Sequence, residues 1–411
     1  MWSRRAFLKA GAVGMFSLTL GGTPTFLGRA ALAATSKKPQ TLVCIFQRGA
    51  MDGLMAVTPF NDPNLRTLRP RIAMSVGPGQ LIDLDGRFGL HPGFAGLERF
   101  YREGRLAIVH GMGSPDNTRS HFDAQDYMET GTPGRKGTRS GWLNRAAGLM
   151  GHDHTPFSCV SLTSAMPRSL YGDFPALAVS DLASFGVQEA PASKVSAGQS
   201  LEALYNNTTQ DLLKGAGQDS FQAVKQLSRE AVRTYRPANG AVYPNGNLGQ
   251  SLRQIAYLIK SGLGLEIAFT ESAGWDTHVN QGTGQGTFFQ RANELANSIS
   301  AFWTDLGSAY QDHVCVMTMT EFGRTCGENG SGGTDHGRGS CMFVLGNKVK
   351  GRQVYGQVPT LARENLEDQR DLPVTTDFRA IFSEVAAKHL KVPAGQELFP
   401  GWNGTRLTLM S

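Results

Sequence analysis

The sequence contains few cysteines, and their spacing excludes the usual cysteine-based sites. Its 411 residues include five cysteines, with no Cys-x-x-Cys pair and no Cys/His zinc pattern, which disfavours redox chemistry and thiolate metal sites. Only Cys326 is placed in a loop; the others lie in apolar, strand-like runs, where cysteine behaves as a small buried hydrophobe. These others are Cys44, Cys159, Cys315 and Cys341. Any bound metal must therefore be held by carboxylates and imidazoles.

The sequence also lacks a long uninterrupted apolar run and a concentrated basic patch. The apolar N-terminal stretch is broken by four glycines and a proline within residues 11–24, so it suits a bilayer span poorly. No basic run with interleaved aromatic residues occurs, and such patches are the usual footprint of nucleic-acid binding. We therefore expect no nucleic-acid partner and no stable membrane span in the mature protein.

The first 33 residues resemble a twin-arginine export signal. The segment "SRRAFLKAG" begins with paired arginines, an apolar stretch follows, and the small residues "ALA" end at Ala33. Cleavage there removes four of the 40 basic residues and no acid, which leaves 36 basic against 34 acidic residues. The basic character therefore belongs largely to the signal. The resemblance implies the twin-arginine export machinery as a partner and a periplasmic or secreted location.

Short apolar runs alternate with helix-like patterns along the mature chain. The runs are rich in β-branched residues and lack alternation, which is typical of strands buried on both faces. Strands alternating with helices predict the fold class α/β, a three-layer α/β/α sandwich with a mostly parallel central sheet. The predicted strands are residues 41–46, 105–111, 157–163, 265–269, 313–320 and 340–346, and the predicted helices are 251–264, 288–311 and 377–391.

Glycine, proline and small polar residues indicate the domain layout. They are frequent at 131–151, 190–200 and 236–249, which are interpreted as loops or insertion borders. We interpret residues 34–411 as one α/β domain. A helical insertion over the main sheet is predicted at about 187–247.

Polar residues follow the ends of several predicted strands. Ligands of an open parallel sheet gather beyond the carboxyl ends of its strands. Taken singly, each residue has an ordinary alternative: Ser120 with Asp123 has the spacing of a helix N-cap, for example. Together, carboxylates and imidazoles at several strand ends favour a divalent-metal site. The residues are Arg48, Asp52, Ser114, Asp116, Ser120, His121, Asp276, His278, Glu321, Arg324, Asp335 and His336.

Five motifs give the sequence a family resemblance over nearly all of the mature chain. They are "LVCIFQRGAMDGL", "RSHFDAQDYMETGTP", "GWDTHVNQ", "MTEFGRT" and "GTDHGRGSCMFVLG", and they resemble the bacterial secreted family named domain of unknown function 1501. The order and strand placement of the motifs also resemble, more remotely, the alkaline phosphatase superfamily, which includes sulfatases. That resemblance implies an alkaline phosphatase-like fold and a metal-dependent hydrolase of phosphate or sulfate esters.

The superfamily resemblance also implies roles for the candidate residues. Ser120 is implied as a nucleophile at a helix start, with Ser114 and Thr118 on the same loop as alternatives. Bidentate hydrogen bonds from an arginine would hold an oxyanion. The implied clamps are Arg48, Arg119 and Arg324, and the implied metal ligands are Asp52, Asp276, His278, Glu321, Asp335 and His336.

The sequence departs from the superfamily pattern at three places. Phe322 stands where the pattern has the histidine of an Asp-His pair. Asp276 and His278 are closer together than in that pattern, and Asp52 lies several residues beyond its strand. We therefore expect one divalent ion rather than two. Zinc, calcium and manganese all accept oxygen and nitrogen ligands, so the sequence does not distinguish them.

Two functional hypotheses follow. The first is an exported metal-dependent hydrolase that acts on a small-molecule or polymer ester. The second is a metal-stabilised binding or assembly protein of the periplasm that keeps the fold without turnover. Bound metal together with hydrolysis of a generic aryl phosphate or sulfate distinguishes the first from the second.

Replacing Arg4 and Arg5 together by lysine is expected to leave an uncleaved precursor in the cytoplasm. A receptor reads the arginine pair as an address, so the retained charge does not rescue export. Cell fractionation with N-terminal sequencing checks this. Normal periplasmic delivery of the double variant would contradict a twin-arginine signal.

Overall fold

The computed structural model describes residues 38–152, 154–183, 229–393 and 395–411. The predicted export signal and most of the predicted insertion lie outside these described residues. Of the insertion, the structure describes helix α10 (Arg229–Thr234) and the loop that leads to the next helix. The signal and the domain boundaries therefore stay predictions.

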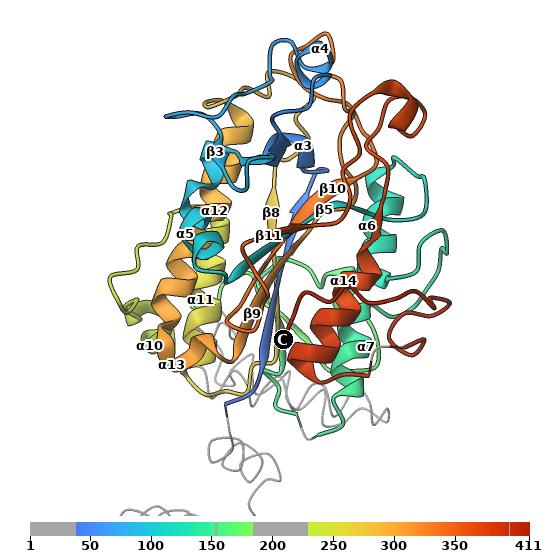
Figure 1. Ribbon diagram of the computed structural model, residues 1–411. Coiled ribbons are helices and arrows are strands. Elements are labelled where there is room, and N and C mark those ends of the chain that lie inside the picture. Colours follow the sequence, from blue (N-terminus) through green and yellow to red (C-terminus); the bar gives the residue numbers. More distant parts are fainter. Residues whose placement is uncertain (1–37, 153, 184–228, 394) are drawn as a thin grey trace, which may run out of the picture.

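A nine-stranded sheet forms the centre of the molecule (Figure 1). Every strand pairs in parallel with its neighbours except β10, which is antiparallel to β5 and β9. In β1, Leu42 lies opposite Ile267 on one side and Cys315 on the other. The order is β11 (Gln353–Tyr355), β5 (Leu106–Gly113), β10 (Ser340–Leu345), β9 (Val314–Met319), β1 (Thr41–Arg48), β8 (Ile267–Ala273), β6 (Cys159–Ser161) and β7 (Leu177–Ala178), and β12 (Thr376–Asp377) pairs with β5.

Helices cover both faces of the sheet and make three layers. Side chains alternate between the faces of a strand, so Val43 and Ile45 of β1 pack into a hydrophobic cluster with α5, α11 and α12. Leu42, Cys44 and Phe46 pack into a second cluster with α7 and α14. Figure 1 shows these two groups of helices on opposite sides of the sheet. The helices are α5 (Ala95–Arg102), α6 (His121–Thr130), α7 (Trp142–Leu149), α11 (Asn247–Lys260), α12 (Thr287–Leu306), α13 (Ser308–Gln311) and α14 (Phe378–Val385).

Shorter elements complete the described chain. β2, β4 and β3 form a small antiparallel sheet. None of the helices in the described ranges is long and apolar enough to cross a membrane. All five cysteines are buried and free of disulfides, including Cys326 in the loop after β9. The short elements are α3 (Gly53–Ala56), β2 (Val57–Pro59), α4 (Leu65–Leu68), β3 (Ile82–Asp83), β4 (Phe88–Leu90), three 3₁₀ turns (Pro92–Phe94, Arg168–Leu170 and Arg363–Asn365) and a π-helical turn (Ala386–Leu390).

The six predicted strands and three predicted helical patterns are confirmed, and so is the α/β fold class with a mostly parallel sheet. Two details differ. β10 runs antiparallel because residues 320–339, which connect it to β9, form loops and isolated bridges rather than a crossover helix. The helix predicted at 288–311 is two helices, because Gly307 adopts a φ of 60° between α12 and α13.

Three buried histidines make the fold sensitive to acid. Burial lowers the pKa of His91, His110 and His389 to about 4. Each ring hydrogen-bonds a main-chain carbonyl through Nε2, which donates. Because these rings stay neutral in the folded protein but take up a proton near pH 6.5 when unfolded, the stability they support is lost as the pH falls from about 6.5 to about 4.

Between pH 7 and pH 5, each of these histidines is expected to lower the free energy of unfolding by about 2 kcal/mol. His389→Gln keeps a donor for the Thr41 carbonyl but does not titrate. Between pH 7 and pH 5, the variant should therefore lose about 2 kcal/mol less unfolding free energy than the wild type. Urea unfolding at pH 7 and pH 5 measures the difference. An unchanged pH dependence in the variant would show that His389 is not buried neutral.

Candidate metal centre

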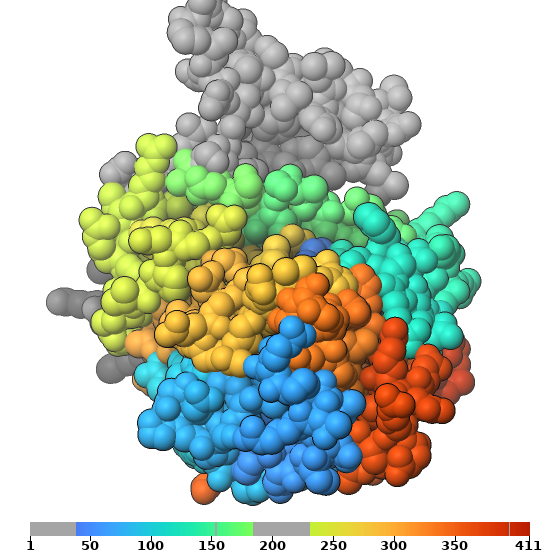
Figure 2. Space-filling view, turned by 90° about the horizontal axis from the view of Figure 1, so that it is seen from above, coloured from blue at the N-terminus to red at the C-terminus, as the bar shows by residue number. Residues whose placement is uncertain are grey.

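The carboxyl end of the sheet brings together residues from distant parts of the sequence. His121 opens α6 after β5, and Glu321 follows β9. Asp276 and His278 follow β8. His336 precedes β10, and because that strand is antiparallel, its amino end lies at the same rim. In Figure 2, the view from above this end, blue, yellow, orange and teal segments meet on one face.

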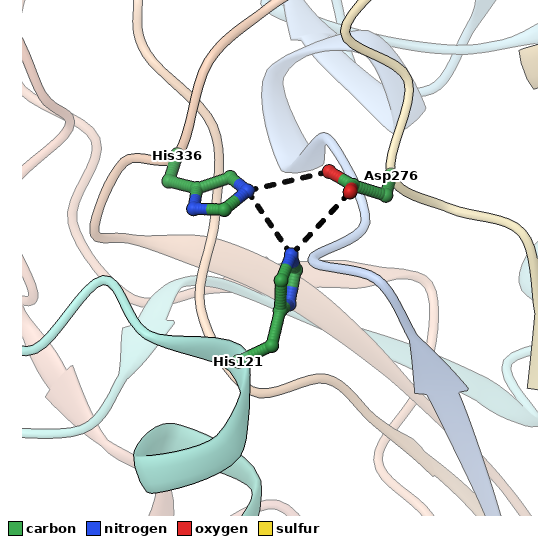
Figure 3. A group of neighbouring side chains, drawn as sticks. All are labelled: His121, Asp276 and His336. Atoms are coloured by element: carbon green, nitrogen blue, oxygen red, sulfur yellow. Dashed lines mark hydrogen bonds and ion pairs between the residues drawn. The ribbon is translucent and has the colours of Figure 1, made fainter.

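The Nε2 atom of His336 faces the Nε2 atoms of both His121 and His278. His336 Nε2 lies 3.0 Å from His121 Nε2 and 3.0 Å from His278 Nε2. Asp276 Oδ1 lies 3.0 Å from His278 Nε2 and 3.3 Å from His336 Nε2, and Oδ2 lies 3.6 Å from His121 Nε2. Figure 3 shows three of these side chains pointing toward a common centre. The four residues His121, Asp276, His278 and His336 are called the rim cluster below.

The other nitrogen of each ring, Nδ1, is held by an oxygen acceptor. A carbonyl oxygen or an ionised carboxylate can only accept a hydrogen bond, so each Nδ1 carries the proton. In a neutral ring, Nε2 is then left with a lone pair directed at the cluster centre. Each Nδ1 lies 2.9 Å from its acceptor: His121 from Glu321 Oε1, His278 from Asp335 Oδ1, and His336 from the main-chain oxygen of Arg119.

Both carboxylate acceptors favour the ionised form. Burial opposes ionisation of Glu321, but hydrogen bonds, led by the one from His121, outweigh it and lower the pKa of that carboxyl. Hydrogen bonds from Asn329 and then His278 lower the pKa of Asp335. The two carboxylates are therefore acceptors at neutral pH, as the ring tautomers require.

Converging lone pairs repel one another unless a proton or a cation lies between them. The hydrogen bond to Glu321 raises the pKa of His121, whereas burial lowers the pKa of His336. A proton on Nε2 of His121 would be shared with His336 Nε2, which lies 3.0 Å away. A divalent cation at the centre would replace that proton, so protons and metal compete for the rim cluster.

The spacing of the ligand atoms fits one small ion. Zinc–ligand distances of about 2.0–2.1 Å place neighbouring ligand atoms of a tetrahedral site about 3.3 Å apart. The distances that His336 Nε2 and the Asp276 oxygens make to each other and to the other two rings run from 3.0 to 3.6 Å. The ligand atoms of His121, Asp276 and His336 all lie within 4.8 Å of one another. Three nitrogens and a carboxylate are also a ligand set that borderline transition ions accept. The residues present therefore fit a single divalent ion.

A buried arginine lies beside the rim cluster. The side chain of Arg324 is 0% exposed, and its Nη2 lies 2.9 Å from Asp276 Oδ1. The two groups form an ion pair through Nη2, and within the described residues Nε and Nη1 of Arg324 have no hydrogen-bond partner. Burial raises the pKa of Asp276, but Arg324 outweighs it and the pKa is lowered overall. Unpaired buried N–H groups are costly, which favours an anionic ligand here.

The structure brings five of the six predicted metal ligands to this rim, in two different positions. Asp276, His278 and His336 direct ligand atoms at the cluster centre. Glu321 and Asp335 lie behind the rings, where each holds an Nδ1 atom. Such carboxylate–imidazole pairs fix the orientation of metal-binding histidines and make them more basic.

Asp52, the sixth predicted ligand, is held away from the rim cluster by a buried ion pair. Its Oδ2 lies 2.9 Å from Arg69 Nη1, and its Oδ1 accepts a hydrogen bond from the Met55 amide at the start of α3. Gln281 donates a further hydrogen bond to Oδ2. Burial opposes ionisation of Asp52, but Arg69 outweighs it and lowers the pKa. In this structure, Asp52 fixes the loop after β1.

His121 is a cluster residue to which the sequence assigned no ligand role. It stands among the polar residues at strand ends, directly after Ser120, at the start of α6. What identifies its role is the hydrogen bond to Glu321, a carboxylate 200 positions away in the sequence whose side chain is 0% exposed. Sequence spacing does not reveal a contact at that separation.

Two of the three predicted oxyanion clamps are already neutralised by carboxylates. Arg48 and Arg119 each contact two acidic side chains, which leaves little net charge for a ligand. In the part of the chain that the structure describes, the guanidinium of Arg324 pairs with one carboxylate, that of Asp276. The contacts are Arg48 with Glu129 at 2.9 Å and Glu271 at 2.6 Å, and Arg119 with Asp371 at 2.6 Å and Asp368 at 2.8 Å.

The three predicted nucleophile candidates differ in exposure. Ser120 is exposed at the N-cap of α6, and its side chain makes no capping hydrogen bond. Ser114 is buried, and its Oγ accepts a hydrogen bond from the amide of Asp116. Thr118 Oγ1 accepts one from the amide of Ser120. Ser120 is therefore the hydroxyl most accessible to a ligand.

Comparison with known proteins identifies a family and a remote likeness of fold. Residues 107–398 match the family described as "Protein of unknown function (DUF1501)". No curated protein matches the sequence. Similar solved structures include the PsFucS1 sulfatase from Pseudoalteromonas sp. (TM-score 0.37, 11% identity, covering 94% of this chain and 77% of that one) and an alkaline phosphatase superfamily protein from Vibrio parahaemolyticus (TM-score 0.32, 11% identity, 82% and 72%). Likenesses this remote leave the assignment of function to the site itself.

Replacing His121, His278 or Asp276 by alanine is expected to weaken zinc binding at least about tenfold, because each change removes a ligand atom from the cluster centre. Elemental analysis after dialysis against limiting zinc measures the loss. His313→Ala is the matched control, since His313 lies at the opposite end of β9 beside the amide of Gln40. Wild-type protein that binds no metal on addition would exclude the site.

Proposed function

The chain belongs to the DUF1501 family, and we propose that it is a metal-dependent hydrolase of phosphate or sulfate esters. The observation that carries this proposal is the rim cluster, where three Nε2 lone pairs and a carboxylate converge beside the buried guanidinium of Arg324. A cation and an arginine with unpaired N–H groups suit a tetrahedral anion, because both stabilise charge on its non-bridging oxygens.

Zinc or another borderline transition ion fits the rim cluster better than calcium, which prefers six to eight oxygen ligands. The three imidazoles and Asp276 would hold the ion, while Glu321 and Asp335 keep two of the rings in position through Nδ1. When bound, such an ion supplies a Lewis acid that withdraws electron density from an ester oxygen. The proposal assigns one ion to the rim cluster.

Arg324 is the residue that would hold the substrate's charged oxygens. Its side chain is buried, so an ionic contact there is less screened by water than one at the surface. The contact with Asp276 through Nη2 keeps the guanidinium beside the cluster, while Nε and Nη1 have no hydrogen-bond partner among the described residues. A phosphate or sulfate group would satisfy these donors with hydrogen bonds to its non-bridging oxygens.

Ser120 is the proposed nucleophile. It stands next to the cluster residue His121, at the start of α6, where helix amides without an internal partner favour an anion. Its Oγ forms a bond to phosphorus or sulfur while the bond to the leaving oxygen breaks, and water then hydrolyses the serine ester. Solvent receives the hydroxyl proton and protonates the leaving alkoxide.

Two exposed apolar side chains indicate the kind of ester. Phe122 follows His121 in the sequence and is 89% exposed, and Val279 follows His278 and is 59% exposed. Single exposed apolar side chains are common on protein surfaces, but these two each follow a cluster residue directly in the sequence. We infer that they contact an apolar or aromatic part of the substrate, so aryl esters are preferred over small alkyl esters.

The site of action proposed for this hydrolase is the periplasm or the exterior of the cell. The support is the N-terminal pattern of paired arginines, an apolar stretch and a small-residue cleavage site ending at Ala33. A soluble ester or a polymer at the cell surface would then be within reach. Export through the twin-arginine route would deliver the folded chain.

Ser120→Ala is expected to retain zinc but to lower kcat on an aryl phosphate or sulfate by at least about 1,000-fold, because the bond-forming oxygen is lost while the ligands remain. Thr118→Ala is the matched control on the same loop and should leave kcat little changed. A zinc-loaded wild type that hydrolyses no member of an ester panel would instead favour a metal-stabilised binding or assembly protein. Full activity in Ser120→Ala would move the nucleophile to Thr118 or Ser114.

A further inference from the structure

A second group of metal-binding side chains lies outside the rim cluster. His152 Nε2 lies 3.0 Å from Glu266 Oε1, and His154 Nδ1 lies 3.0 Å from Glu266 Oε2. The ligand atoms of the three residues all lie within 4.8 Å of one another. The two imidazole rings are neighbours as well, with their centroids 4.7 Å apart. We call His152, His154 and Glu266 the basal cluster.

The basal cluster lies at the opposite end of the sheet from the rim cluster. Glu266 directly precedes β8, whereas Asp276 follows the same strand. The seven residues of β8 separate the two positions, a span of about 23 Å at about 3.3 Å per residue. One ion cannot serve both clusters, so any metal in the basal cluster would be a separate ion.

Main-chain contacts fix the position of the basal cluster. The Glu266 amide donates to the Ser158 carbonyl at 2.9 Å, and the Glu266 carbonyl accepts from the Leu42 amide of β1 at 2.8 Å. The hydroxyl of Thr155 donates to the Leu263 carbonyl at 2.7 Å. The loop before β6 is thereby attached to the turn before β8, and the ligands of the cluster are brought together before any ion binds.

The charge of Glu266 is not balanced by a fixed cation. Its side chain is only 9% exposed, and its partners among the described residues are the two imidazoles and no lysine or arginine. A buried carboxylate is costly unless it is paired or coordinates a metal. Neutral imidazoles can donate hydrogen bonds to it, but a divalent ion would also balance its charge.

We propose that the basal cluster binds a second transition-metal ion of the zinc type, which ties the loop before β6 to the amino end of the sheet. His152 Nε2, His154 Nδ1 and the Glu266 carboxylate supply the ligands, and water completes the coordination. A tetrahedral site places two ligand nitrogens about 3.3 Å apart, so ion binding would turn the two imidazoles toward that separation. The side chain of His152 is more than half exposed.

The proposal is tested by titrating the metal-free full-length protein with zinc in a calorimeter. Wild-type protein is expected to bind two ions, and His152→Ala and His278→Ala one each. His152→Ala removes an exposed ring and should leave the fold intact, which circular dichroism verifies. Because binding to the folded state stabilises it, zinc should also raise the Tm of His278→Ala, and the added His152→Ala change should abolish that rise.

His313→Ala, a histidine change at the same end of the sheet, is the matched control and should bind as many ions as the wild type. A single ion in wild type that survives in His278→Ala and disappears in His152→Ala would support the basal cluster and contradict the rim cluster. The basal site is overturned if His278→Ala binds no zinc, or if His152→Ala binds as many ions as wild type.

Discussion

The fixation of three imidazoles through Nδ1 is the constraint on which the rim of this protein depends. Once Glu321, Asp335 and the Arg119 carbonyl each accept an Nδ1 proton, the Nε2 lone pairs can only face the cluster centre. This arrangement is unfavourable without a proton or cation between the rings. The acceptors therefore explain both the ring orientations and the fit to a metal ion, and Glu321, fully buried, fixes one of them rigidly.

The sheet makes that convergence possible. Parallel strands bring the residues after β5, β8 and β9 to one end, and the antiparallel β10 brings the residues before it to the same place. Asp52 has a complementary role, since its buried pair with Arg69 and its contact with Gln281 hold the neighbouring loops in place. Breaking a buried pair of this kind costs about 3–5 kcal/mol, so Asp52 affects stability strongly without facing the cluster.

Much of the fold and part of the site could be predicted from the sequence. Strands such as β1 are apolar on both faces, which identifies them directly, and Asp276, His278 and His336 lie at strand ends. The direction of β10 could not be predicted, because it depends on a connection without a helix. The ligand position of His121 and the pairing of Asp52 with Arg69 could not be predicted either, because both depend on contacts between residues that local patterns do not relate.

The central claim is that one ion occupies the centre of the rim cluster, and anomalous diffraction from a zinc-loaded crystal tests it most directly. The account predicts a peak at the zinc edge within about 2.0–2.1 Å of the Nε2 atoms of His121, His278 and His336 and of an Asp276 oxygen. It also predicts that each Nδ1 keeps its oxygen acceptor. A zinc-loaded crystal with no peak at this position, or with rings turned so that Nδ1 faces the centre, would contradict the account.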